Sequence, residues 1–131
     1  MGTIESRIVA YGHGGLSPDM LAVHSTGNAG ATAENHVSYW SNHPDYAVHV
    51  VSDWKHAFNT VPYDKLCWQV GNANGKVEGI EICEATNRED FDAGIGIAAK
   101  AVAERLKARG WGVDKLVTHK WCSETYGGSD H

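Results

Sequence analysis

The chain has 131 residues, of which 42% are hydrophobic and 21% are charged, and its formal net charge is -5. This length suits one compact domain and leaves no room for a second, and no apolar run approaches the roughly 20 residues that span a bilayer. The acidic balance, without a cluster of Lys and Arg, argues against a nucleic-acid backbone as partner. We therefore expect a single soluble domain, monomeric, that neither enters a membrane nor binds nucleic acid.

The start of the chain lacks a basic segment followed by a long apolar one, so we expect synthesis in the cytoplasm without a secretory signal. Cys67, Cys83 and Cys122 are odd in number and form no CxxC pair, which favours a reduced compartment over a disulfide framework. Cys83 alternates with apolar neighbours and is expected in the core. Residues 2–19, rich in Gly and polar residues, are predicted to be irregular, and no chemistry is assigned to His13.

The first clear strand leads into the stretch LAVHSTGN, where three apolar residues run directly into His24 and a polar rim. A second histidine, His119, closes a short β-prone run near the end of the chain, KLVTH. Two strand-end histidines can converge if their strands share a sheet, and neutral imidazoles are the commonest protein ligands for zinc. Each alone also fits a hydrogen-bonded surface or core histidine, but together they indicate two ligands of a metal site.

A helix and a hairpin are predicted next. Apolar residues at positions i, i+4 and i+7 mark one face of a short helix from about Thr32 to Asn42, with Thr32 as its N-cap. Two β-prone runs, residues 46–52 and 56–60, flank a short polar turn and predict a hairpin. His49 lies inside the first run, and we interpret it as structural.

The segment 77–83, VEGIEIC, predicts another strand. Glu81 then shares a face with Gly79 and Cys83, which is an unusual position for a carboxylate. A buried carboxylate is costly unless it is paired or its pKa shifts. A solvated face explains the same alternation, so this segment alone leaves both interpretations open.

The clearest helix covers about residues 88–109. Apolar residues spaced four, three, four and four apart mark the face expected to pack across the sheet: Phe91, Ile95, Ala98, Val102 and Leu106. Asn87 with Asp90 predicts the start of the helix, and Gly110 predicts its end. We assign this helix to the core, without a catalytic residue, and predict that residues 120–131 form a polar loop.

This order of elements predicts an α/β fold, a single mixed central β-sheet flanked by helices. The segments LAVHSTGN, AVHVVSD, VPYDKLCWQVGN, VEGIEIC and LVTHKW, in this order and spacing, resemble the zinc-dependent N-acetylmuramoyl-L-alanine amidases of the phage lysozyme and peptidoglycan recognition protein superfamily. The resemblance covers about residues 18–131, and the combination of the GIE motif with two strand-end histidines is its most specific part.

The resemblance implies that His24 and His119 bind Zn²⁺, that Glu81 is the catalytic acid and base, and that Trp68 contacts the substrate. Zinc lowers the pKa of bound water to about 7 and polarises a carbonyl, while a nearby carboxylate can move the proton. The implied reaction is hydrolysis of the amide between N-acetylmuramic acid and L-alanine in bacterial peptidoglycan. The implied setting is an endolysin that degrades the cell wall during phage-mediated lysis, after release from the cytoplasm.

The sequence departs from the family at two places in the central part of the chain. Gln69 stands where the family usually has a histidine after the tryptophan, here Trp68. Val48 stands where some members carry a tyrosine before the hairpin histidine. An imidazole seen in many relatives is therefore missing at position 69. Transition-state assistance from a tyrosine is not expected at position 48, and Tyr46 lies two positions away.

The third zinc ligand is also unmatched. Relatives supply an Asp or Cys followed by Pro, with a basic residue two positions earlier, and His131 resembles that basic residue. His131 is then expected to donate to the oxyanion of the transition state, and the ligand would lie beyond the chain, making residues 1–131 a catalytic domain cut near its C-terminal end. Asp130 or His131 as the ligand is the alternative.

Three other functions remain open: a module that binds peptidoglycan without cleaving it, a zinc peptidase acting on the stem peptide, and a cytoplasmic amidase that recycles small muropeptides. Non-catalytic relatives typically lose a zinc ligand. This chain retains His24, His119 and Glu81, which favours an enzyme over the binding module.

Overall fold

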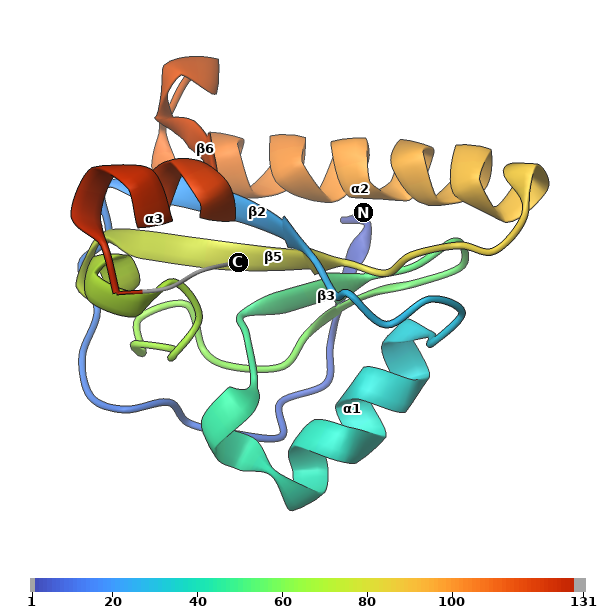
Figure 1. Ribbon diagram of the computed structural model, residues 1–131, viewed down its shortest axis with the longest axis horizontal. Coiled ribbons are helices and arrows are strands. Elements are labelled where there is room, and N and C mark those ends of the chain that lie inside the picture. The colour runs from blue at the N-terminus through green and yellow to red at the C-terminus, as the bar shows by residue number, and fades with distance from the viewer. Residues whose placement is uncertain (1, 129–131) are drawn as a thin grey trace.

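The computed structural model describes residues 2–128 and shows one sheet with helices on both sides (Figure 1). Its six strands are Ile4–Ser6 (β1), Met20–Ser25 (β2), Val50–Ser52 (β3), Ala57–Asn59 (β4), Val77–Ile82 (β5) and Leu116–Thr118 (β6). They lie in the order β1-β4-β3-β5-β2-β6, and within residues 2–128 the one antiparallel pair is β3 with β4. The predicted single mixed sheet and its hairpin are therefore confirmed.

Helices α1 (Ala33–Asn42) and α2 (Arg88–Arg109) cover opposite faces of this sheet (Figure 1). Neighbouring residues of β3 show why: Val51 belongs to the buried cluster that contains Trp40 of α1, and Val50 to the one that contains Leu106 of α2. Successive side chains of a strand point to opposite faces, so a strand apolar on both faces needs a cover on each. The two helices supply these covers.

Both predicted helices begin as their local sequence indicates. The Thr32 hydroxyl accepts a hydrogen bond from the Asn35 N–H, and the Asn35 side chain accepts one from the Thr32 N–H, which makes a capping box. The Asn87 side chain accepts from the Asp90 N–H at 2.9 Å. Gly110 ends α2 with φ 73°, in the left-handed region that favours glycine.

The C-terminal segment corrects the prediction of a polar loop. Residues His119–Tyr126 form helix α3, and the hydroxyl of Thr118 caps it by accepting from the Trp121 N–H at 3.0 Å. Cys122 is fully buried and packs this short helix against Val77 of β5. The two buried residues of this helix are His119 and Cys122, and one buried apolar side chain in eight residues gives no apolar repeat, which is why the sequence pattern did not indicate a helix.

Two strand boundaries near the N-terminus and the hairpin were also predicted wrongly. The supposedly irregular start contains β1, whose three residues pair in parallel with β4. Such a short edge strand carries too little periodicity to be detected, and its backbone partners lie far along the chain. The first hairpin strand begins at Val50, not Tyr46, because Pro44–Tyr46 forms a 3₁₀ turn (η1).

Two further 3₁₀ turns are Gly71–Lys76 (η2) and Val113–Lys115 (η3).

The predicted core face of α2 is correct only for its C-terminal half. Ala98 and Leu106 are buried, whereas Phe91 and Ile95 are 53% and 50% exposed. The N-terminal part of α2 extends past the ends of β2 and β5 (Figure 1). There the buried Gly94 faces the backbone of Asp53 and Trp54, while Phe91 and Ile95 stay half-exposed. Phe91 and Ile95 line a cleft instead, and the assignment of the whole helix to the core was wrong.

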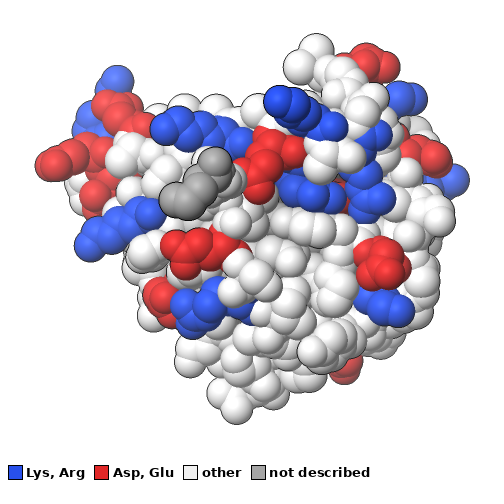
Figure 2. Space-filling view, turned by 180° about the vertical axis from the view of Figure 1, so that it is seen from behind, with Lys and Arg blue, Asp and Glu red and all other residues white. Residues whose placement is uncertain are grey.

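Charges of both signs are interspersed on the surface seen from behind the view of Figure 1 (Figure 2). In that view most Lys, Arg, Asp and Glu side chains lie in the upper half, and the lower part is largely uncharged. Among residues 2–128, no helix combines the length and the apolar composition that crossing a membrane requires.

Candidate active site

Three titratable side chains meet where β2, β5 and β6 end. His24 and Glu81 are register partners on the neighbouring parallel strands β2 and β5. His119 follows β6 directly, and β6 pairs with the other edge of β2. Parallel strands end at the same edge of a sheet, which is where ligands bind in open α/β sheets. The topology therefore brings together the two strand-end histidines and the glutamate singled out in the sequence.

These three side chains line a cleft of about 920 Å³. Trp68 from the segment before η2, together with Phe91 and Ile95 from α2, adds apolar surface to its lining. Ligand sites typically combine such apolar walls with a few convergent polar groups, in volumes of about 300 to 1,000 Å³. The cleft has the size and the chemical character of a substrate site.

The two histidines fit two ligands of a zinc ion. Their ring centres are 5.2 Å apart and the ring planes are inclined at 79°. An ion held about 2.1 Å from one nitrogen of each ring, with a tetrahedral angle at the metal, requires ring centres about 5 Å apart. The His24 side chain is 7% exposed and His119 is 8% exposed. Both imidazoles are therefore already shielded from bulk solvent at the place where they would bind the ion.

Glu81 lies beside this pair, with Oε1 3.5 Å from Nδ1 of His24. Its side chain is only 16% exposed, and burial raises the pKa of its carboxyl to about 7. A carboxyl that titrates near neutral pH can both accept and release a proton. A pKa shifted in this direction, inside a cleft, is typical of a functional residue.

A third protein ligand does not appear within the described part of the chain. Residues 2–128 contain no group of three His, Cys, Asp or Glu placed to hold one metal ion. Asp130 and His131, the alternatives to a ligand beyond residue 131, lie outside the described residues. The third ligand and the catalytic role expected for His131 therefore remain predictions.

Gln69, which the sequence presented as a missing imidazole, contacts the site. Its Oε1 lies 3.3 Å from Nε2 of His24, whereas Glu81 faces the other ring nitrogen. The signal available in the sequence was its place after Trp68, where relatives carry another side chain able to form hydrogen bonds. Sequence reasoning recorded the substitution without assigning Gln69 a role.

Trp68 lines the cleft and is 52% exposed, a position that allows the predicted contact with substrate. His13, to which no chemistry was assigned, stacks on its indole, with ring centres 3.5 Å apart and planes inclined by 1°. Nε2 of His13 lies 3.2 Å from the backbone oxygen of Asp45. A lone histidine in a glycine-rich segment gave no indication of this contact.

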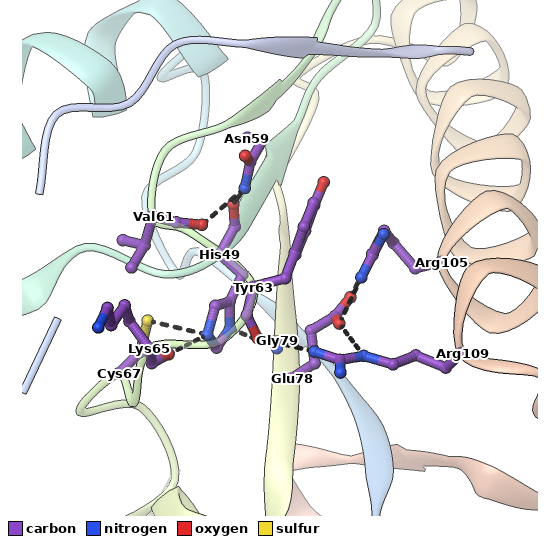
Figure 3. Close-up of polar contacts among 10 residues, drawn as sticks. All are labelled: His49, Asn59, Val61, Tyr63, Lys65, Cys67, Glu78, Gly79, Arg105 and Arg109. Carbon is purple, nitrogen blue, oxygen red and sulfur yellow. Dashed lines mark hydrogen bonds and ion pairs between the residues drawn. The ribbon is translucent and has the colours of Figure 1, made fainter. Parts of the chain in front are cut away.

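A buried ion cluster fixes β5 to α2 (Figure 3). Glu78 is fully buried and accepts hydrogen bonds from Arg105 at 2.6 and 2.8 Å and from Arg109 at 2.9 Å. The Arg105 guanidinium also lies 3.3 Å above the ring centre of Tyr63. Arg105 and Arg109 lie one helical turn apart on α2, far from Glu78 along the chain, so no local pattern in the sequence indicated this cluster.

His49 is fully buried next to this cluster (Figure 3). Its Nδ1 accepts from the Gly79 N–H at 3.0 Å, so its Nε2 carries the proton and donates to the Lys65 oxygen at 2.6 Å. Burial lowers the pKa of this imidazole, which keeps it neutral. These contacts account for His49 as a structural residue.

Known proteins share both this sequence pattern and this fold. Residues 14–128 match the N-acetylmuramoyl-L-alanine amidase family. The chain is 30% identical over 112 residues to the N-acetylmuramoyl-L-alanine amidase CwlA of Bacillus subtilis, a match covering 80% of this chain and 41% of CwlA. A match to XlyB of the same organism covers 37% of that protein, so the chain spans about two fifths of the length of these relatives.

Two solved structures have the same architecture. The Staphylococcus aureus hydrolase AmiA, solved with its ligand, superposes with a TM-score of 0.85 at 26% identity, covering 98% of this chain and 70% of that one. A mutant endolysin from Bacillus subtilis superposes with a TM-score of 0.81 at 27% identity, covering 95% and 88%. With most of its length matched to the family, this chain belongs to the N-acetylmuramoyl-L-alanine amidases.

Proposed function

We propose that this chain catalyses zinc-dependent hydrolysis of the amide bond between N-acetylmuramic acid and L-alanine in bacterial peptidoglycan. The observation that carries the proposal is the convergence of His24, His119 and Glu81 in one cleft. Membership of the amidase family, and the activity named for CwlA and XlyB, support the choice of bond.

Each residue of the site has a distinct task in this reaction. His24 and His119 would hold the ion through neutral imidazole nitrogens. When bound, zinc supplies Lewis-acid chemistry that polarises the scissile carbonyl and favours attack by water. Glu81 takes the proton from the attacking water and delivers it to the departing amine of L-alanine. The pKa of about 7 that burial gives this carboxyl suits both proton transfers.

The apolar lining of the cleft would hold the substrate on both sides of the scissile bond. The half-exposed indole of Trp68 offers a flat surface for the apolar face of the sugar or its lactyl group. Phe91 and Ile95 offer further apolar surface from α2. Such contacts position the carbonyl against the catalytic groups. Correct positioning of reacting groups can supply a large part of the reduction in the activation free energy.

Product analysis tests this proposal. The zinc-loaded chain is incubated with a soluble N-acetylmuramoyl peptide, and the products are identified by mass spectrometry. We expect intact N-acetylmuramic acid and a peptide with a free L-alanine amine, and no cleavage by a chain with both His24→Ala and His119→Ala. Cleavage between amino acids of the stem would instead indicate a peptidase, and binding without cleavage a recognition module; either result refutes the amidase assignment.

We also propose that the activity serves lysis of the cell wall, as in an endolysin, with recycling of muropeptides as the alternative. The similarity to an endolysin structure at 27% identity supports this role. Rates on intact sacculi and on soluble anhydro-muropeptides separate the two. A strong preference for the soluble substrate would contradict the lytic role.

A further inference from the structure

We propose that Gln69 is a positioning residue: it holds the His24 ring so that Nδ1 is the nitrogen that binds the metal, and Gly79 provides the space in which the Gln69 amide lies. This inference rests on the proposed role of His24 as a zinc ligand. It gives a task to a residue that the family comparison presents only as the loss of an imidazole.

The two nitrogens of His24 face different partners. Nε2 lies 3.3 Å from Oε1 of Gln69, an acceptor, and Nδ1 lies 3.5 Å from Oε1 of Glu81, also an acceptor. We infer from the shorter contact that Nε2 carries the proton. A neutral imidazole has its lone pair on the other nitrogen, here Nδ1, which lies on the side of Glu81. The Gln69 contact therefore selects the tautomer and the orientation of the ring together.

Histidine ligands of metal ions usually depend on such a contact. Their second nitrogen almost always donates to a carboxylate, a carbonyl or water, which fixes the tautomer and aims the ring. In this chain the side-chain carbonyl of Gln69 occupies that position behind His24.

The position of the Gln69 amide depends on the missing side chain at residue 79. A Cβ atom on Gly79 would overlap Oε1 of Gln69 and would lie 2.6 Å from its Cδ. The Gly79 backbone is itself fixed, because its N–H donates to the buried His49 (Figure 3). Strand β5 thus presents bare backbone at the one place where the amide packs.

The backbone of Gln69 is also fixed. Oδ1 of Asn74 accepts from the N–H groups of both Gln69 and Val70, at 2.8 and 2.7 Å. The Nε2 atom of Gln69 is buried and has no hydrogen-bond partner among residues 2–128. A buried donor without a partner is costly, so the contact made by the amide oxygen must offset this cost.

Histidine tautomers in the zinc-free protein test the contact directly. Gln69→Met removes the acceptor and keeps the length of the side chain. In ¹⁵N–¹H correlation spectra of the histidine rings, we expect His24 to be the Nε2–H tautomer in the wild type and to lose that preference in the variant. His36, whose Nδ1 lies 2.8 Å from the Thr32 oxygen, serves as an internal reference that should not change. An unchanged tautomer of His24 in Gln69→Met would overturn the proposal.

Zinc affinity, measured by chelator competition, is the second readout. We expect Gln69→Met and Gly79→Ala each to weaken binding about 10- to 100-fold, the usual effect of losing such a contact. Gly75→Ala is the matched control, because its Cβ would meet Leu66 Cδ1 at an ordinary 3.9 Å. Wild-type affinity in a folded Gln69→Met protein refutes the inference.

These two readouts separate this inference from the proposed function. A wild type that binds no zinc contradicts the metal site, while the tautomer comparison still decides the role of Gln69. Gln69→Met leaves strand β5 intact, so the test does not depend on whether Gly79→Ala folds.

Discussion

The backbone N–H of Gly79 donates a hydrogen bond to Nδ1 of His49 at 3.0 Å, and this bond requires a neutral imidazole. The opposite nitrogen donates to the Lys65 oxygen, so both nitrogens of a fully buried ring are satisfied only in this one tautomer. Protonation would turn Nδ1 into a donor facing another donor. The protonation state of His49 is thus linked to the stability of strand β5, which carries Glu81.

We expect the free energy of unfolding to fall as the pH drops below about 6.5, the usual pKa of histidine. Burial lowers the pKa of His49 in the folded protein, so the unfolded chain takes up the proton first. The stability due to neutral His49 is then complete above about pH 6.5 and is lost as the pH falls toward the lower folded-state pKa. Urea unfolding of the wild type and His49→Gln at about pH 7.5 and about pH 5.5 measures this. Equal pH dependence in both proteins would refute it.

Removing one arginine of the buried cluster should destabilise the fold. In Arg105→Met the fully buried Glu78 loses the guanidinium that donates two hydrogen bonds to it. Breaking a buried ion pair in this way lowers the free energy of unfolding by about 3 kcal/mol. Arg88→Met is the control, because Arg88 pairs with Asp92 on the surface of the same helix. Urea denaturation compares the two, and similar losses of stability would contradict a special role for the buried pair.

Zinc content per chain should depend on both histidines. His24→Ala and His119→Ala each remove one of the two ligands in the cleft, and we expect each to abolish stoichiometric binding. Elemental analysis of the purified proteins measures this, and a stoichiometric ion in either variant places the metal elsewhere. Asp130→Ala tests the third ligand: loss of an ion bound by the wild type would identify Asp130.

Glu81→Gln should separate binding from catalysis. Gln is close in size and cannot exchange a proton, so we expect zinc content to be retained and turnover to fall about 10²- to 10⁴-fold. Steady-state rates on a soluble muramoyl peptide, with zinc content measured on the same samples, provide the comparison. Full activity in this variant would show that another group transfers the proton.

His13→Ala should weaken substrate binding without slowing chemistry. Without its stacking partner, the Trp68 indole loses a contact worth about 0.5 to 1.5 kcal/mol, so we expect KM to rise about two- to tenfold at unchanged kcat. His43→Ala is the matched control, because His43 stacks on Tyr39 at 4.1 Å and does not line the cleft. Equal effects of the two variants on KM would rule out a specific role for His13.

Elements whose signals are local could be predicted from the amino-acid sequence. Capping residues are neighbours of the backbone groups that they satisfy, so Thr32 and Asn87 located the starts of α1 and α2. The alternation and order of apolar runs predicted one mixed sheet. Two histidines at strand ends, His24 and His119, pointed to a shared edge because parallel strands of one sheet end together.

Features that depend on contacts between distant segments could not be predicted from the sequence and became apparent in the folded chain. Whether an apolar helical face meets the sheet or a cleft depends on how far the helix extends beyond the strands, and this placed Phe91 and Ile95 at the site. The contact of Gln69 with His24 requires the bare backbone of Gly79. Such contacts are set by packing in three dimensions, which leaves no periodicity in the sequence because the partners are not neighbours along the chain.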